Sequence, residues 1–230
     1  SKELLDKAVS SDRKSRDIQG LVRSLIRRAD TQRLLGNYTA SLDDIQEALR
    51  LAGSDSSLQL YYAEALRLKG LNLYRLGESR RAVESLEHSL SLFSAMNEPG
   101  RISILLMETG MVHGAVGDID SARASYQKAL KLKQVESDLY TQAEILNNLA
   151  VLYHQIGEYE LASETFEAGL MSARKSRNRR AEAIILAGLG DLYSEVEEFD
   201  SSPQSYRQAE IAAGNIAGLS VKNYLIVARG

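Results

Sequence analysis

Apolar and polar residues alternate along this chain with the period of an α-helix, and the pattern is clearest in residues 146–170. There Leu146, Leu149, Ala150 and Tyr153 recur at the spacing i, i+3, i+4 and i+7, which places them on one helical face. Gly157 ends this helix, and a second amphipathic helix follows within a few residues. The stretch therefore predicts a hairpin of two helices.

The same sequence markers return at an interval close to 40 residues. Each set consists of a glycine position, a residue two later that is often aromatic, a small residue and a large apolar or aromatic residue. The five sets are Gly36, Tyr38, Ser41 and Ile45; Gly77, Ala82 and Leu86; Gly117, Ile119, Ala122 and Tyr126; Gly157, Tyr159, Ala162 and Phe166; and Glu197, Phe199, Ser202 and Tyr206. A fixed period over five sets of markers indicates a repeat architecture.

We expect five repeats at 22–52, 63–93, 103–133, 143–173 and 183–213, in a single array over residues 1–230. Residues 1–16 align with the second helices and predict the second helix of a preceding repeat, and residues 219–230 align with the start of a sixth. Neither predicted end carries the polar cap of a complete solenoid. We therefore expect a segment of a longer protein, whose uncapped ends can self-associate.

A small residue lies seven positions before each glycine position, on the first helix of each predicted hairpin. These residues are Ala29, Gly70, Gly110, Ala150 and Gly190. A bulky side chain there would push the two helices apart, so we expect this to be the closest approach within each hairpin. The small residues of the second helices should face the same contact.

These features resemble the tetratricopeptide repeat over essentially the whole chain. The resemblance implies an all-α fold, a right-handed superhelical solenoid of antiparallel helix pairs whose concave groove is lined mainly by the first helices. The chain departs from the family in having no tryptophan, no proline that closes the second helices, and a period of 40 instead of 34. HEAT repeats have a similar period and remain an alternative. WD40 repeats need strands and a Trp-Asp pair that this chain lacks.

Composition narrows the function classes. The absence of cysteine excludes disulfides, thiolate zinc sites and thiol catalysis. A net charge of −3 and a pI near 5.7 argue against a generally basic nucleic-acid surface. No apolar run approaches the roughly 20 residues of a membrane span, and the N-terminal residues are unlike a signal peptide. We expect a cytoplasmic protein that contacts neither nucleic acid nor membrane directly.

The sequence offers little support for catalysis. The three histidines, His88, His113 and His154, are far apart, and His113 takes the place of packing tyrosines in other repeats. The metal motif HExxH, the phosphate loop GxxxxGK[ST] and the nucleophile motif GxSxG are all absent. We therefore predict no enzyme activity, no catalytic residues, no metal and no cofactor.

If the first helices line a groove, its residues lie three and two before, one after, and four or five after each small residue, on one helical face. The predicted partner-binding residues are Arg27, Arg33, Arg67, Tyr74, Arg75, Met107, Met111, Asn147, Asn148, His154 and Asp191. Arginine binds carboxylates through two N–H groups, methionine adapts to apolar partners, and asparagine pairs with a peptide backbone. The adjacent asparagines are similar to the groove asparagines of peptide-binding tetratricopeptide proteins. The series predicts a groove with a basic N-terminal part and an acidic end.

We therefore predict a module that binds a protein or a peptide. The long units resemble the 40-residue arrays of MalT-like bacterial transcription regulators, which implies a sensor or interaction segment of such a regulator. The alternative is a scaffold like the arrays of kinesin light chains or of LGN-type adaptors. An accessory domain of an enzyme is a third option. The cluster Arg174, Lys175, Arg177, Arg179 and Arg180 suggests a nucleic-acid contact, but it lacks interleaved aromatic residues and falls in a predicted connection, which favours a solvated loop.

Overall fold

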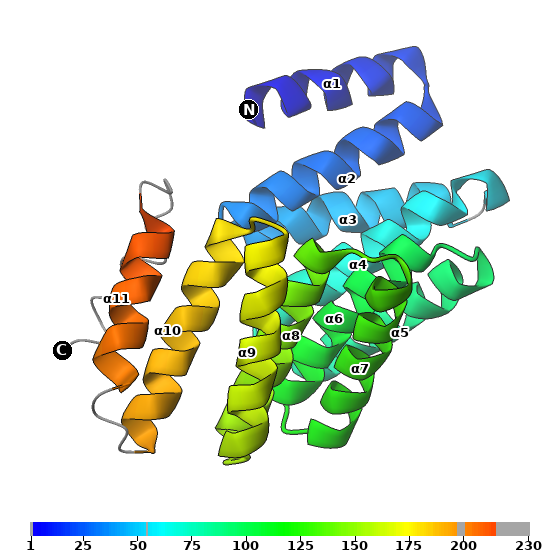
Figure 1. Cartoon of the computed structure of the whole chain (residues 1–230). Helices are drawn as coiled ribbons and strands as arrows, with labels where there is room; N and C mark the ends of the chain where they lie inside the picture. Colours follow the sequence, from blue (N-terminus) through cyan, green and yellow to red (C-terminus); the bar gives the residue numbers. More distant parts are fainter. Residues whose placement is uncertain (1, 54, 197–200, 215–230) are drawn as a thin grey trace. The chain divides into compact units, whose positions relative to one another are not determined.

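The computed structural model describes residues 2–53, 55–196 and 201–214, and all regular elements within these ranges are helices (Figure 1). The first helices of the hairpins are α2 (Ile18–Leu34), α4 (Gln59–Arg75), α6 (Pro99–Ala115), α8 (Leu139–Gln155) and α10 (Arg179–Glu195). The second helices are α3 (Tyr38–Ala52), α5 (Ser79–Ala95), α7 (Ile119–Val135), α9 (Tyr159–Lys175) and α11 (Ser201–Ala213). Helix α1 (Lys2–Ser15) precedes them, and a 3-10 turn, η1 (Ser56–Leu58), leads into α4. The predicted all-α class is confirmed.

The chain divides into two compact units, residues 1–118 and 119–230, which we call unit 1 and unit 2. Unit 1 contains α1 to α6, and unit 2 contains α7 to α11. Within unit 1, α2 packs on α3 and α4 on α5, and the first helices α2 and α6 both contact α4. Within unit 2, α8 packs on α9, α10 on α11, and α8 also contacts α10. The single array over residues 1–230 stays a prediction, and the predicted sixth repeat at 219–230 lies outside the described residues.

Each first helix begins four residues before the start predicted for its repeat. Polar caps explain several of these starts, because the first N–H groups of a helix have no partner within the helix. The Asp17 carboxylate accepts a hydrogen bond from the Gly20 N–H at the start of α2. Asp138 and Asn178 accept equivalent bonds at the starts of α8 and α10.

Glycine ends four of the first helices in the left-handed conformation that it adopts without strain. Gly36, Gly77, Gly117 and Gly157 have φ values of 80°, 81°, 81° and 78°. After α8, the Gly157 N–H donates to the His154 carbonyl and the Glu158 N–H donates to the Tyr153 carbonyl. These bonds satisfy carbonyl groups that the helix leaves unpaired and turn the chain into the next helix.

Three of the small residues on the first helices, Ala29, Gly70 and Gly190, lie in close contact with the second helix of the hairpin. A Cβ atom added to Gly70 would lie 2.6 Å from the Leu86 side chain and 3.0 Å from the Ala82 carbonyl oxygen. A Cβ atom at Gly190 would lie 2.7 Å from the Tyr206 ring. Two serines of the second helices use the same close approach for a hydrogen bond. Ser41 donates to the Ala29 carbonyl at 2.7 Å and Ser202 to the Gly190 carbonyl at 3.0 Å.

The core forms where the large side chains of the second helices meet the first helices. The predicted packing residues Ile45, Leu86, Tyr126, Phe166 and Tyr206 are all buried. Burial of such side chains is the main favourable term in the folding of each hairpin, at about 2–3 kcal/mol for a side chain of this size. His113 is also buried, in agreement with a packing role, and its Nδ1 lies 3.3 Å from the Asp118 carboxylate.

Candidate functional site

The predicted binding residues lie on the first helices of both units. We call the side of α2, α4 and α6 that carries them the first-helix face of unit 1, and the corresponding side of α8 and α10 the first-helix face of unit 2. The two faces differ in the state of their polar groups. The face of unit 1 is crossed by ion pairs, whereas the face of unit 2 carries amide groups that are only partly hydrogen-bonded.

In unit 1, the guanidinium of Arg67 is held by two carboxylates. Its Nε and one of its terminal nitrogens donate to the two oxygens of Glu108 on α6, both at 2.7 Å, and the other terminal nitrogen donates to Glu64 on α4 at 2.6 Å. The side chains of Arg67 and Glu108 are only 20% and 13% exposed. Burial opposes the charge of Arg67, but the two carboxylates outweigh it and raise its pKa. Burial also raises the pKa of Glu108 against the attraction of Arg67.

The ion pairs continue along the same face. Arg33 on α2 donates two hydrogen bonds to Asp30, at 2.7 and 3.0 Å, and Arg101 on α6 reaches Glu64 at 3.3 Å. Arg33 and Arg67 therefore have their charges balanced within unit 1. For these two arginines the predicted basic character is neutralised, because acidic partners come from neighbouring turns and neighbouring helices.

The remaining predicted residues of unit 1 are not held by ion pairs with described residues. Arg27 and Arg75 are exposed, and within the described part of the chain no carboxylate pairs with either; Arg75 lies 5.9 Å from the centre of the half-buried Tyr74 ring. Met107 and Met111 are half-buried, and Met111 packs against the core. The position two before the small residue is not uniformly on this face, since Leu68 there is only 1% exposed.

In unit 2, the two predicted asparagines are adjacent and half-buried on α8. The Asn147 Nδ2 donates to the Asn148 Oδ1 over 3.4 Å, a long hydrogen bond. The Asn147 Oδ1 is buried and accepts no hydrogen bond from any described residue. A buried carbonyl without a donor costs free energy of about 1–3 kcal/mol, so this side chain gains from a new partner.

Two further predicted residues of unit 2 are already bonded. The His154 Nε2 lies 2.6 Å from the Glu195 carboxylate of α10, which also accepts the Tyr159 hydroxyl at 3.0 Å. These two hydrogen bonds lower the pKa of Glu195. Asp191 accepts the hydroxyl of Tyr206 at 2.6 Å, which supports that ring where it packs. Both contacts link elements of the same unit and stabilise the arrangement of its helices.

The position six before each small residue also belongs to the first-helix faces, although the offsets predicted from the sequence do not include it. This position holds Glu64 in the ion-pair network of unit 1 and Glu144 in unit 2. Burial raises the pKa of Glu144. The same position holds Ile104 and Ile184, which are 40% and 36% exposed. Its helical spacing of three from the predicted position was the signal that could have revealed it.

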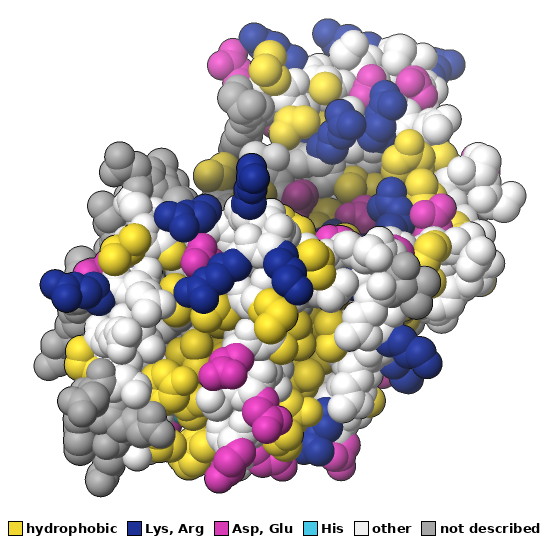
Figure 2. All heavy atoms as spheres, in the orientation of Figure 1, with side chains coloured by type: hydrophobic (Ala, Val, Ile, Leu, Met, Phe, Trp, Pro, Cys, Tyr) yellow, Lys and Arg dark blue, Asp and Glu magenta, His cyan; other side chains and the backbone are white. Residues whose placement is uncertain are grey.

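The basic cluster at residues 174–180 is partly neutralised. Figure 2 shows Lys and Arg side chains gathered near the end of α9 that leads into α10. Arg174 and Arg179 both pair with Glu182, at 3.0 and 3.3 Å. Arg174 and Lys175 also lie in the last turn of α9, where positive charge is favoured by the helix dipole. Local helix stability thus accounts for part of this cluster.

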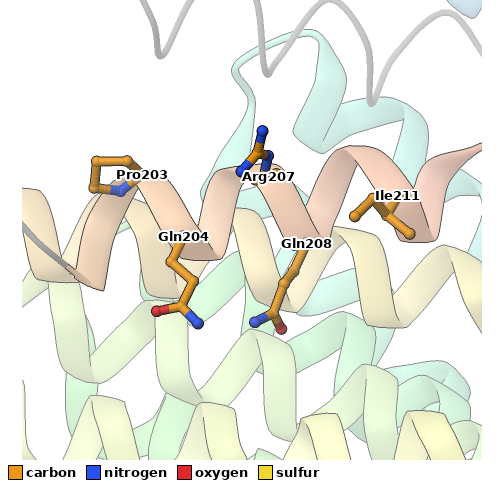
Figure 3. A pocket seen from close by; sticks show the side chains of 5 residues that line it. All are labelled: Pro203, Gln204, Arg207, Gln208 and Ile211. Atoms are coloured by element: carbon orange, nitrogen blue, oxygen red, sulfur yellow. The ribbon is translucent and has the colours of Figure 1, made fainter.

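The described residues contain no group of three or more acidic or histidine side chains arranged to hold a metal ion. Within the same residues, no helix combines the length and apolar character needed to cross a membrane. A hollow along α11 is lined by Pro203, Gln204, Arg207, Gln208 and Ile211 (Figure 3). All five side chains come from one helix, and we assign no function to this hollow.

Comparison with known families identifies the repeats. The family model described as Tetratricopeptide repeat matches residues 101–175 and 141–210. Residues 101–210 contain tetratricopeptide repeats. The repeat is a protein-interaction fold, so the chain carries a protein-interaction module of the tetratricopeptide type. A second model, described as Anaphase-promoting complex subunit 5, matches residues 3–69. No curated protein sequence matches the chain.

Solved structures share the fold at low sequence identity. BtubC (BKLC) from P. vanneervenii superposes with a TM-score of 0.80 at 17% identity, over 94% of this chain and 91% of that one. A Rap protein, solved in complex with Competence and Sporulation Factor, gives a TM-score of 0.78 at 14% identity, over 99% of this chain and 62% of that one. A signal-transduction ATPase (STAND) protein with a tetratricopeptide repeat sensor from Pyrococcus horikoshii gives 0.68 at 17%, over 92% of this chain and 36% of that one.

Proposed function

We propose that this chain is a non-catalytic module that binds an extended peptide or a protein segment on the first-helix face of unit 2. The unsatisfied amide of Asn147 carries the proposal. A main-chain N–H of a bound segment would meet the Asn147 carbonyl after a small side-chain rotation, and Asn148 would pair with the neighbouring peptide group. His154 and Asp191 border this region, and the exposed side chain of Ile184 offers an apolar contact on α10.

Unit 1 contributes a second set of contacts in this proposal. Arg27 and Arg75 offer charged N–H donors to acidic side chains of a partner, because their charges are not balanced by described carboxylates. Tyr74, Met107 and Met111 offer apolar surface. Arg33 and Arg67 support the face from within their ion pairs.

As the wider setting, we propose the sensor or interaction segment of a larger cytoplasmic bacterial transcription regulator that needs no cofactor. The fold shared with a STAND protein that has a tetratricopeptide repeat sensor supports this setting. The fold shared with a Rap protein solved with Competence and Sporulation Factor supports a small partner. A nucleotide-binding or helix-turn-helix domain in the same polypeptide would agree with the regulator, whereas flanking coiled coils would favour a scaffold.

Peptides selected on the purified chain from a random display library provide the probe. For a selected peptide, fluorescence anisotropy should show a loss of affinity of about tenfold or more in the double variant Asn147→Ala, Asn148→Ala, since two hydrogen-bonding amides are removed. Gln127→Ala, at an exposed position of α7, is the matched control and should leave the affinity unchanged. Unchanged affinity in the double variant would remove the amide pair from the site.

A scaffold in a stable complex is the second candidate. The match of residues 3–69 to the model described as Anaphase-promoting complex subunit 5 favours it. A scaffold should co-purify with its partners at fixed stoichiometry, which native mass spectrometry measures. A chain that purifies alone and binds a selected peptide reversibly would support the sensor instead.

A further inference from the structure

Unit 1 contains a cavity away from the residues predicted to bind the partner. It has a volume of about 280 Å³ and lies between α3, α4 and α5. Its lining residues are Leu42, Ile45, Gln46 and Leu49 of α3, Lys69 and Leu73 of α4, Glu78, which precedes α5, and Arg81 of α5. Four of these eight are aliphatic, and we call the other four, Gln46, Lys69, Glu78 and Arg81, the polar rim.

The charged groups of the rim differ in whether an opposite charge lies within ion-pair distance. Glu78 and Arg81 form an ion pair with each other. Lys69 is half-buried, and among the described residues no carboxylate lies within ion-pair distance of it. The lining therefore includes one lysine whose charge is not balanced by a described carboxylate, together with four aliphatic side chains.

The preceding repeat shows how this position is neutralised elsewhere in the chain. Lys69 lies one residue before Gly70, as Arg28 lies one residue before Ala29. Arg28 donates to Asp44 on α3 at 2.6 and 2.8 Å and to Asp6 on α1 at 2.9 Å. These carboxylates raise the pKa of Arg28 although burial opposes them. The cation at this position thus binds one carboxylate from the second helix on each side.

Both carboxylates are missing in the next repeat. The residue that corresponds to Asp44 is Ser85, which donates to the Arg81 carbonyl at 2.9 Å. The residue that corresponds to Asp6 is Gln46, which lines the cavity. Where the first repeat has two aspartates around its cation, the second repeat has neutral side chains and an open space.

We propose that this cavity binds a small aliphatic carboxylic acid. Its carboxylate takes the place of the missing aspartates at Lys69, where a charge-assisted hydrogen bond forms in a partly dry environment. Its aliphatic chain packs against Leu42, Leu49 and Leu73, which removes apolar surface from water. The volume lies at the lower limit of small-molecule sites, about 300 Å³, which favours a short free acid.

Octanoate and its neutral analogue octanamide are the probes, and isothermal titration calorimetry on the full chain is the measurement. Octanoate should bind at least tenfold more tightly than octanamide. Lys69→Met should remove this preference, while Arg80→Met, which removes an exposed cation of α5, should keep it. Equal binding of the two probes to the unmodified chain overturns the proposal.

The variant Gln46→Asp tests the comparison between repeats directly. It restores the carboxylate that the first repeat carries, so it should pair with Lys69, weaken octanoate at least tenfold and leave helicity by circular dichroism unchanged. Undiminished octanoate binding in this variant contradicts the assignment of Lys69 as the ligand's partner. Acetyl-leucyl-leucine is the third probe, and tighter binding of this peptide than of octanoate would overturn the assignment to a small aliphatic carboxylic acid.

Discussion

At the residue scale, Arg67 shows that a charged side chain on a first helix can stabilise the contact between two helices instead of binding a partner. Its guanidinium joins α4 to α6 through Glu108, and the two side chains exclude most water from their contact. A buried ion pair gains little over an apolar pair, but removing one partner leaves an uncompensated charge. The contribution of Arg67 therefore depends on Glu108 remaining in place.

We predict that Arg67→Ala lowers the free energy of unfolding by about 3 kcal/mol, because Glu108 then keeps a charge in a largely buried position. Urea denaturation followed by circular dichroism measures this loss. Arg75→Ala, at an exposed position of the same helix, should cost less than about 0.5 kcal/mol. The double variant Arg67→Met, Glu108→Leu should recover most of the stability, and an equal loss in Arg67→Ala and Arg75→Ala would contradict the role of the pair.

The sequence predicted the helices and their pairing into hairpins, but it did not predict the charge state of the residues on the first-helix faces. Helical spacing placed both Arg67 and Glu108 on one face. These two residues are 41 positions apart in the sequence. Whether they pair depends on how far α4 and α6 are shifted along each other, and the repeat period does not determine this shift. The missing hydrogen bond of the Asn147 carbonyl could not be predicted either, because it depends on the side chains packed around that residue.

At the element scale, the start of α8 depends on one carboxylate. Asp138 accepts the N–H and the hydroxyl of Thr141 at 3.0 and 2.7 Å, and Lys133 lies 3.4 Å away at the end of α7. Burial raises the pKa of Asp138, but the hydrogen bonds and the lysine outweigh it and lower this pKa below its ordinary value. The ionised form therefore stabilises the connection between α7 and α8.

We predict that Asp138→Asn costs about 1 kcal/mol at pH 7, because asparagine keeps the cap but loses the charge beside Lys133. The folded pKa is the lower one, so the contribution of the charge is complete above the unfolded value of about 3.9 and is lost as pH falls through the folded value. Thermal unfolding from pH 7 to pH 3 should show the difference from the unmodified chain shrink below about pH 4. Glu167→Gln, at an exposed position of α9, is the control; a difference independent of pH contradicts the charge as its cause.

A substitution in the turn after α9 should increase the stability of the fold. Arg177 has φ of 57°, a left-handed conformation that glycine adopts without strain. Arg177→Gly should therefore raise the free energy of unfolding by about 1 kcal/mol, while Arg177→Ala should give no such gain, because alanine keeps the Cβ atom. Thermal unfolding of both variants measures this. A rise of equal size in both would point to relief of charge repulsion in the basic cluster instead.

Glycine correctly marked the turns after the first helices, since four of the five predicted turn positions are glycines with positive φ. It could not mark the turns after the second helices, where Asn97, Ser137 and Arg177 take the same conformation without being glycine. The packing of the helices on both sides keeps these residues in a strained conformation. A local sequence pattern carries no information about that packing.

At the scale of the whole molecule, each unit has its own described core. One cluster of unit 1 includes Phe93, Leu86 and Leu105, and a cluster of unit 2 includes Leu186, Tyr206 and Ala209. In repeat proteins, stability is approximately a sum of local terms, because each repeat contacts only its neighbours. Loss of a core side chain should therefore open its own part of the chain first.

Phe93→Ala in unit 1 and Phe166→Ala in unit 2 form a matched pair, since both rings are fully buried in second helices. Each should cost about 3–5 kcal/mol. Hydrogen exchange followed by mass spectrometry should show faster exchange in α4 and α5 for Phe93→Ala and in α8 and α9 for Phe166→Ala. A first helix of the other unit, α10 or α2 respectively, should exchange as in the unmodified chain. Equal acceleration over all described helices in both variants would show that these helices unfold in one cooperative step, and stability could then not be assigned repeat by repeat.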